Sequence, residues 1–164
     1  PAVISQLVEL VTKEGKSPKT EFVGKSAKYI LDKIGITVGD DVKVILMEAK
    51  EDHPFVQVEL MMPILPLVRV PDVDQAIEMA VRVEHGNRHT AMMHSRNVEK
   101  LTKMAKLIQT TIFVKNGPSY AGIGVGGEGY TTFTIAGPTG EGLTSAKSFA
   151  RRRRCVLVGG MDVR

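Results

Sequence analysis

Cys155 carries the most nucleophilic type of side chain in the sequence, and its neighbours are cationic. Arg153 and Arg154 come directly before it, and nearby cations lower the pKa of a thiol and raise its reactivity. However, Cys155 also begins the apolar run CVLV, and no histidine lies close to it in the sequence. Small buried cysteines are common in protein cores. We therefore interpret Cys155 as a core residue of a terminal strand and not as a nucleophile.

The four histidines do not form a metal-binding set. His89 and His94 are five positions apart in a predicted strand, an odd spacing, so their side chains should point to opposite faces. His85 and His89 are four residues apart, but Gly86 interrupts the helix that would align them. Because the chain has one cysteine and no C-x-x-C motif, we expect no zinc site, no internal disulfide bond and no metal ligand.

Ser119 does not have the sequence context of a serine nucleophile. It lies in GPSYA, where a nucleophile elbow would need a glycine in place of Ala121 and a helix directly after it. The sequence therefore does not indicate a serine hydrolase.

A glycine-rich stretch holds nine glycines between Gly117 and Gly142. This is too many for a packed element, and it would let the backbone approach a ligand closely. Gly122, Gly124 and Gly127 satisfy G-x-G-x-x-G, but the dinucleotide fingerprint needs a helix at the third glycine. The YTTFT that follows favours a strand. We therefore expect a loop that shapes a ligand cleft at the carboxyl ends of strands.

Glu59 is a lone carboxylate in the apolar segment HPFVQVELMMPILPLVRV. A carboxylate in apolar surroundings must find hydrogen-bond donors or take up a proton. The residues alone leave two interpretations open. Glu59 either forms a structural ion pair or faces solvent, or it accepts hydrogen bonds from the hydroxyl groups of a ligand.

Helical and strand patterns alternate along the chain. Apolar residues at helical spacing predict helices over 2–13, 26–34, 54–61, 72–86, 97–108 and 144–149. Apolar and β-branched runs predict strands over 42–47, 64–70, 89–94, 111–115 and 153–158. Asp72 and Asn97 should cap the helices that follow them. Helices between strands are typical of crossovers in a parallel sheet, so we expect an α/β fold with a mostly parallel sheet and flanking helices.

Composition bounds the class of protein. The chain has 164 residues, 43% of them apolar and 24% charged, which fits one ordinary domain with a core. The 22 Lys and Arg exceed the 18 Asp and Glu by four, and Arg151–Arg154 account for that excess. No nucleic-acid-binding surface is therefore indicated. No apolar run is long enough to cross a bilayer, so we expect a soluble cytoplasmic protein without a membrane or nucleic-acid partner.

Five segments together resemble one enzyme family. The segments are HPFVQVELMMPILPLVRV, HTAMMHSRN, TTIFVKNGPSYAGIG, TTFTIAGPTGEGLTSAKSF and RRRRCVLV. In this order they resemble the C-terminal part of the catalytic domain of the CoA-acylating aldehyde dehydrogenases of the propanediol- and ethanolamine-utilisation type. The resemblance runs from Pro1 to the end of the chain. It implies that 1–164 is a single partial catalytic domain, with the glycine-rich cleft loop and the terminal interface strand as parts of it.

The resemblance also implies an activity. Members of the family oxidise a short-chain aldehyde to its acyl-CoA, with NAD or NADP as cofactor and coenzyme A as co-substrate. It implies that the nucleophilic cysteine and the cofactor-binding domain lie upstream of Pro1, because Cys155 does not match the family nucleophile. The chain alone is then expected to be inactive.

Several residues match family positions. Glu59, in the E-x-x-x-P block that ends at Pro63, matches the glutamate that accepts hydrogen bonds from the nicotinamide ribose. His89 in the HT pair matches a histidine near the acyl and CoA side of the active site. Asn116 and Ser119 match neighbours of the active site. The positions implied to line the cleft are Pro118, Thr134, Ile135 and Gly137.

The remaining expectations concern partners and location. The resemblance implies a homo-oligomer, a dimer or a tetramer, whose contacts use the terminal strand 153–158. It also implies a place in the cytoplasm or inside a bacterial microcompartment. It does not choose between acetaldehyde and propionaldehyde. The alternative is a stand-alone α/β module that binds a nucleotide or CoA and has no enzymatic activity.

Overall fold

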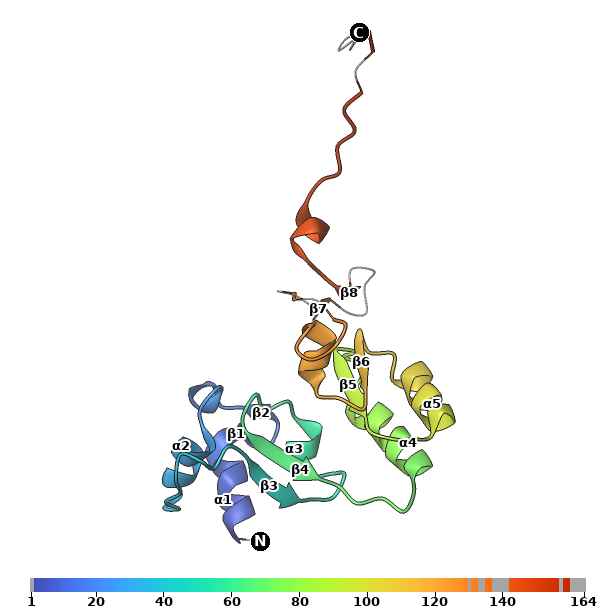
Figure 1. Cartoon of the computed structure of the whole chain (residues 1–164). Coiled ribbons are helices and arrows are strands. Elements are labelled where there is room, and N and C mark those ends of the chain that lie inside the picture. Colours follow the sequence, from blue (N-terminus) through green and yellow to red (C-terminus); the bar gives the residue numbers. More distant parts are fainter. Residues whose placement is uncertain (1, 130, 133–134, 137–141, 157, 160–164) are drawn as a thin grey trace. The chain divides into compact units, whose positions relative to one another are not determined.

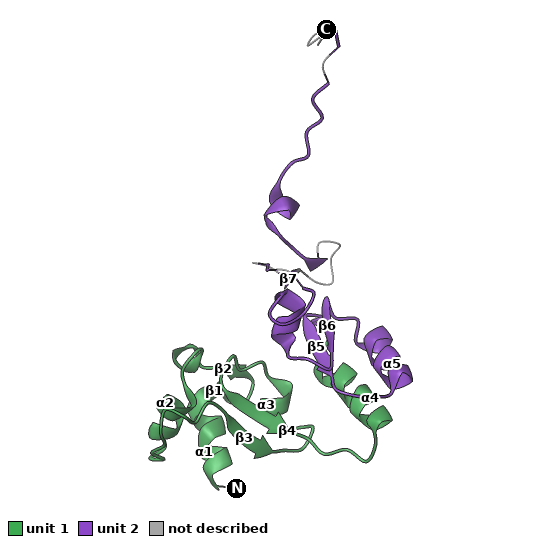
Figure 2. Ribbon diagram, viewed as in Figure 1, with its two compact units in different colours: residues 1–85 green, residues 86–164 purple. Residues whose placement is uncertain are grey.

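The chain divides into two compact units. The computed structural model describes residues 2–129, 131–132, 135–136, 142–156 and 158–159. Unit 1 spans 1–85 and unit 2 spans 86–164 (Figure 2). In both units helices and strands alternate along the chain (Figure 1). The expected single partial catalytic domain over 1–164 stays a prediction.

Short elements make up each unit. Unit 1 contains α1 (Ala2–Val11), β1 (Thr12–Lys13), β2 (Ser17–Pro18), the 3₁₀ helix η1 (Thr20–Phe22), α2 (Ala27–Asp32), β3 (Ile45–Glu48), α3 (Pro54–Gln57), β4 (Ile64–Leu67) and α4 (Val73–Val83). Unit 2 contains β5 (Thr90–Met93), α5 (Val98–Ile108), β6 (Ile112–Lys115), η2 (Ser119–Ile123), β7 (Ile135–Ala136), β8 (Gly142–Leu143) and η3 (Ala146–Phe149). Within the described ranges, no helix has the length and apolar character needed to cross a membrane.

One apolar cluster forms the core of unit 1. Val11 of α1 and Ile30 of α2 are both 0% exposed, and Ile64 of β4 packs in the same cluster. Burying a large aliphatic side chain contributes about 1.5–3 kcal/mol. The cluster also includes Leu60, so it anchors the loop between α3 and β4, where Glu59 lies.

Asp72 and Asn97 begin their helices as predicted. The Asp72 carboxylate accepts a hydrogen bond from the backbone N–H of Gln75 at 2.9 Å. This bond holds the pKa of Asp72 below its usual range. The side-chain oxygen of Asn97 accepts a hydrogen bond from the backbone N–H of Lys100 at 3.0 Å. Both predicted helix starts, at α4 and α5, are confirmed.

Two of the strand ladders are parallel. β3 pairs with β4, and β5 pairs with β6. A helix connects the strands in each pair, α3 in one and α5 in the other, so the α/β class is confirmed. The described strands do not join into one sheet, because β1–β2 and β7–β8 are separate antiparallel pairs. The structure therefore shows short parallel sheets with helices, in place of the single mostly parallel sheet that was expected.

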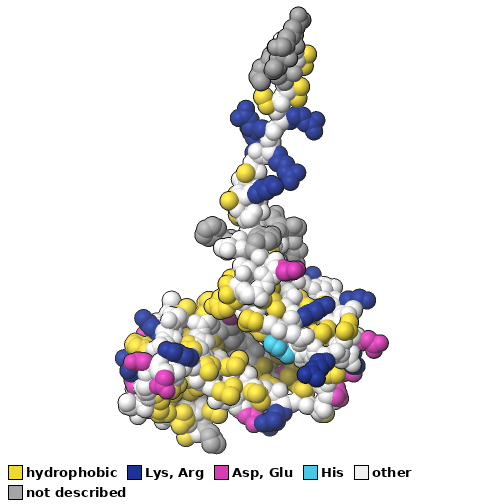
Figure 3. Space-filling view, viewed as in Figure 1, with side chains coloured by type: hydrophobic (Ala, Val, Ile, Leu, Met, Phe, Trp, Pro, Cys, Tyr) yellow, Lys and Arg dark blue, Asp and Glu magenta, His cyan; other side chains and the backbone are white. Residues whose placement is uncertain are grey.

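The predicted terminal strand is absent from the described part of 153–158, and Leu157 lies outside the described residues. A strand forms through hydrogen bonds to a neighbouring strand, and this segment pairs with no described strand. Cys155 is exposed, so its interpretation as a core residue is wrong. Val156 and Val158 are 70% and 89% exposed. The arginines before them are also exposed, and Figure 3 shows basic side chains along this segment in dark blue.

Candidate functional site

Glu59 presents its carboxylate to solvent. It lies in unit 1 on the loop between α3 and β4, where its neighbour Leu60 is 6% exposed and Glu59 itself is exposed. Within the described residues, the carboxylate takes part in no hydrogen bond and no ion pair. The structural ion pair considered from the sequence is therefore not formed there. The carboxylate oxygens of Glu59 are therefore open to accept hydrogen bonds from ribose hydroxyls. That Glu59 binds the nicotinamide ribose stays a prediction.

Met61 fixes the shape of the loop that carries Glu59. Its φ is +52°, in the left-handed region, which costs a non-glycine residue about 1 kcal/mol. The carbonyl of Met61 accepts a hydrogen bond from the N–H of Gly24 at 3.0 Å. Its side chain is 58% exposed. The position of Glu59 thus depends on a contact between segments far apart in the sequence.

A pocket of about 560 Å³ opens beside Met61. Its walls are Gly24–Lys28, Asp40, Val42, Lys43 and Met61–Pro63. The walls come from three separate segments of unit 1, so no local sequence pattern could reveal the pocket. The lysines of the pocket, Lys25, Lys28 and Lys43, therefore have no signal in the sequence alone.

In unit 2, the predicted site residues divide between the two ends of the β5–β6 ladder. His89 directly precedes β5, whereas Asn116 directly follows β6. Because the strands are parallel, these two residues lie about 10 Å or more apart along the strand direction. Pro118 and Ser119, at the start of η2, lie at the Asn116 end. The structure therefore brings Asn116, Pro118 and Ser119 together and leaves His89 apart from them.

His89 is exposed, and its neighbour Thr90 orients its ring. The ring atom Nδ1 lies 2.7 Å from Oγ1 of Thr90, and the tautomer of the histidine decides which atom donates. This contact favours one orientation of the ring, as a proton-transfer group would need. Among the residues that the structure describes, no three His, Cys, Asp or Glu side chains are placed to hold a metal ion.

Asn116 uses its side chain to join two chain segments. Its Oδ1 accepts a hydrogen bond from the backbone N–H of Ser95 at 2.7 Å, and its Nδ2 donates to the Ser95 carbonyl at 2.9 Å. The φ of Asn116 is +57°, a region that asparagine tolerates better than most residues. Both polar groups of the side chain are thus engaged, which suits Asn116 to positioning the loop after β6. Its place as a neighbour of the active site stays a prediction.

Replacing Asn116 by alanine is expected to destabilise the chain by about 2 kcal/mol, because two hydrogen bonds of about 0.5–1.5 kcal/mol each are lost. Asn116→Gly loses the same bonds but adopts the left-handed backbone freely, so it should cost about 1 kcal/mol less. Urea unfolding of the two variants beside the unmodified chain measures both differences. Wild-type stability in both variants would contradict the structural role.

The structure describes some of the other predicted site residues and not others. Pro118 is exposed and Ser119 is half-buried at the first turn of η2. Ile135 lies in β7, opposite Leu143 of β8. Thr134 and Gly137 lie outside the described residues. Their role as cleft-lining residues therefore stays a prediction.

Two glycines of the glycine-rich loop are closely packed, one against β6 and one within the loop. A Cβ placed on Gly122 would overlap the side chain of Ile112, and a Cβ on Gly129 would overlap the backbone of Gly122 and Ala121. No helix begins at Gly127, although the dinucleotide fingerprint requires one. Close packing, against a side chain at Gly122 and against backbone at Gly129, therefore explains these two glycines without a ligand, a reason that the sequence pattern did not reveal.

Comparison with known proteins gives a consistent picture. Residues 42–141 match the model of the aldehyde dehydrogenase family. The chain is 52% identical over 165 residues to the CoA-propanoylating propanal dehydrogenase of Salmonella typhimurium, covering 100% of this chain and 35% of that protein. It is 51% identical over 158 residues to the acetylating acetaldehyde dehydrogenase of Escherichia coli, covering 96% and 34%. The chain thus spans about a third of the length of these curated relatives.

Solved structures agree with this result. The propionaldehyde dehydrogenase of Rhodopseudomonas palustris, solved with bound CoA and an acylated cysteine, superposes with a TM-score of 0.89 at 70% identity, covering 100% of this chain and 37% of that one. An engineered glycolyl-CoA reductase with bound NADP⁺ gives a TM-score of 0.88 at 70% identity, covering 100% and 37%. A propionaldehyde dehydrogenase from the fucose utilisation bacterial microcompartment of Clostridium phytofermentans gives 0.84 at 50% identity, covering 98% and 37%.

Proposed function

The chain belongs to the aldehyde dehydrogenase family, and from this premise we propose that it is part of an enzyme that converts a short-chain aldehyde to its acyl-CoA with a nicotinamide cofactor. The names of its relatives, a CoA-propanoylating and an acetylating dehydrogenase, support this reaction. Because the chain spans about a third of their length, we propose that the active enzyme includes a further part of the same polypeptide. The observation that carries the proposal is the open carboxylate of Glu59 in the E-x-x-x-P block.

The proposed reaction needs a nucleophile that this chain does not supply. A cysteine thiolate attacks the aldehyde carbonyl, a hydride passes to the oxidised nicotinamide, and the thiol of CoA takes the acyl group from the resulting thioester. We assign the thiolate to a cysteine outside residues 1–164. Cys155 is exposed, but its place in the terminal segment does not match that of the family nucleophile.

Glu59 fits the ribose of the cofactor. A carboxylate with open acceptor positions accepts two neighbouring hydroxyl groups, and charged hydrogen bonds are stronger than neutral ones. The loop is held by Leu60 in the core and by the bond between Met61 and Gly24, so the backbone that carries the carboxylate is in place before the ligand arrives. Relatives have been solved with CoA and with NADP⁺, which supports both as ligands of the whole enzyme. NAD is the alternative nicotinamide cofactor.

Glu59→Gln in the whole enzyme should slow hydride transfer or speed cofactor dissociation by about 10- to 100-fold, the equivalent of about 1.5–3 kcal/mol for a charged hydrogen bond. Single-turnover kinetics separate these two steps. Glu21→Gln is the matched control, because Glu21 is an exposed carboxylate of the same unit. If Glu59→Gln behaves like Glu21→Gln, the ribose assignment is wrong and Glu59 is only a solvent-facing residue.

The other assignments complete the proposal. His89 would act on the acyl and CoA side, while Asn116, Pro118 and Ser119 shape the cleft, with Thr134, Ile135 and Gly137 along its lining. The substrate is a short aldehyde, as the names of the relatives suggest. We propose a homo-oligomer, a dimer or a tetramer, in which a partner completes the terminal segment 153–158 as a strand. A place inside a bacterial microcompartment is supported by the origin of one relative, and the cytoplasm is the alternative.

A further inference from the structure

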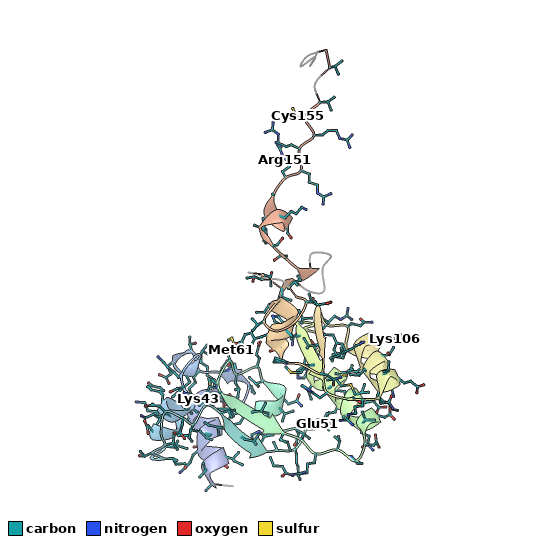
Figure 4. All side chains as sticks on the ribbon, in the orientation of Figure 1. Lys43, Glu51, Met61, Lys106, Arg151 and Cys155 are labelled. Carbon is teal, nitrogen blue, oxygen red and sulfur yellow. The ribbon has the colours of Figure 1, made fainter. Side chains whose placement is uncertain are left out.

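A series of polar contacts joins α4 to the loop that carries Glu59. Arg82, in the last turn of α4, contacts Glu51 on the loop between β3 and α3, and Glu51 contacts Gln57, the last residue of α3. We propose that Arg82 is a positioning residue for the loop of Glu59. The inference rests on the proposed function, because it concerns the loop whose carboxylate is assigned to the ribose. Figure 4 labels Glu51, the middle member of the series.

Arg82 and Glu51 form a two-point ion pair. Nε of Arg82 donates a hydrogen bond to Oε1 of Glu51 at 2.8 Å, and Nη2 donates to Oε2 at 3.0 Å. Such a fork fixes the direction of a carboxylate as well as its distance, which a single-point surface pair does not do. The hydrogen bonds from Arg82 also hold the pKa of the Glu51 carboxyl below its usual range. The pair therefore keeps both charges at neutral pH.

The backbone of Glu51 passes this restraint to α3. Its carbonyl oxygen accepts a hydrogen bond from Nε2 of Gln57 at 2.6 Å. Since the fork holds the side chain of Glu51, the carbonyl of the same residue stays directed at the end of α3. The helix has four residues, too few to be stable through its own backbone hydrogen bonds. The bond at Gln57 therefore helps to decide where the chain leaves α3.

Glu59 lies midway between two restrained residues. Gln57, two residues before it, is bonded to Glu51. Met61, two residues after it, is bonded to Gly24. Two residues of extended chain span at most about 7 Å, so a shift at either end moves the segment between them. A displacement of about 1 Å can lower the rate of an enzyme strongly, which makes the contacts of Gln57 relevant to the proposed reaction.

The test is a double-mutant cycle in the whole enzyme, followed by single-turnover kinetics. Arg82→Gln should impair the step that Glu59→Gln impairs, hydride transfer or cofactor retention, by about 3- to 10-fold, the range for one neutral hydrogen bond. In the Glu59→Gln background, Arg82→Gln should add less than about 2-fold, because residues that act as one unit are not additive.

Arg69→Gln is the matched control. Nε of Arg69 lies 2.7 Å from Oε1 of Glu48, so this variant also removes one arginine and one exposed ion pair of unit 1. It leaves the bond between Glu51 and Gln57 in place. We expect Arg69→Gln to change the same kinetic step by less than about 2-fold, as is usual for a single-point surface pair.

Two kinetic results would overturn the inference. The first is an equal effect of Arg82→Gln with and without the Glu59 carboxylate, which would show a general structural role. The second is an equal effect of Arg82→Gln and Arg69→Gln. If Arg82→Gln unfolds, Gln57→Met removes the amide at the other end of the series and replaces it in the same cycle, with the same expected results.

Nuclear magnetic resonance of the 164-residue chain separates the inference from the proposed function. Arg82→Gln should shift the backbone amide signals of 57–60 and the side-chain amide signals of Gln57, whereas Arg69→Gln should leave them in place. If Glu59→Gln changes neither kinetic step, the ribose assignment fails, and these signals alone decide whether Arg82 positions the loop. Signals that stay unchanged in Arg82→Gln would contradict the inference and leave the proposed function standing.

Discussion

The 164-residue chain, incubated with propionaldehyde, CoA and NAD, is expected to form no acyl-CoA. Under the proposed mechanism, the thiolate that attacks the aldehyde lies elsewhere in the polypeptide, and loss of a nucleophile lowers a rate by about 10⁴-fold or more. Residues such as Glu59 and His89 can only bind and orient the ligands. The measurement is the absorbance of NADH, together with mass spectrometry of the acyl-CoA, for the chain and for the whole enzyme at equal concentration.

Cys155→Ser supplies the control for this experiment, because Cys155 is the one cysteine of the chain. Activity of the chain that persists in Cys155→Ser would contradict the need for a cysteine from outside. Activity that disappears in Cys155→Ser would make Cys155 the nucleophile. It would overturn the assignment of the thiolate to a cysteine outside residues 1–164.

The glycine-rich loop should tolerate alanine at one position and not at another. Gly129→Ala would place a Cβ against the backbone of Gly122 and Ala121, closer than any ordinary contact. Backbone atoms cannot move aside as a side chain can, so we expect a loss of about 3 kcal/mol, the upper part of the range for overpacking. Urea unfolding of the chain, followed by a spectroscopic signal from unit 2, gives the free energy of unfolding and so measures this loss.

Gly126→Ala is the matched control within the same loop. Gly126 has a φ of +71°, and a Cβ there would meet nothing within 4 Å. Only the left-handed backbone penalises alanine at this position, by about 1 kcal/mol. If Gly129→Ala costs no more than Gly126→Ala, the packing account fails, and the earlier expectation that these glycines admit a ligand regains support.

Interactions between residues close in sequence made part of the fold predictable. Asp72 and Asn97 marked helix starts correctly, because a capping side chain bonds to a backbone N–H three residues later. Helix ends were less predictable. The helix expected over 54–61 ends at Gln57, because Val58 is already extended and Leu60 turns into the core. The terminal strand 153–158 could not be judged from its own residues, since a strand depends on a neighbour.

The candidate site was harder to predict, because its geometry depends on contacts between distant segments. The residues around Glu59 left open an ion pair, a solvent-facing position or a ligand contact, and the turn at Met61, bonded to Gly24, leaves the carboxylate exposed. Asn116 was recognised by resemblance, but its bonds to Ser95 exist only because β5 and β6 pair. The lysine pocket has no local signature, since its walls come from three segments.

The central claim is that this chain is part of an enzyme that forms an acyl thioester on a cysteine and passes the acyl group to CoA. The claim places that cysteine outside residues 1–164. The most direct measurement treats the whole protein with propionaldehyde and NAD in the absence of CoA, and then locates the propionyl group by peptide mass spectrometry. We predict a propionyl thioester on a cysteine outside 1–164, released when CoA is added, with Cys155 unmodified. A propionyl group on Cys155, or no propionyl group on any cysteine, would contradict the account, and the second result would favour a binding module without enzymatic activity.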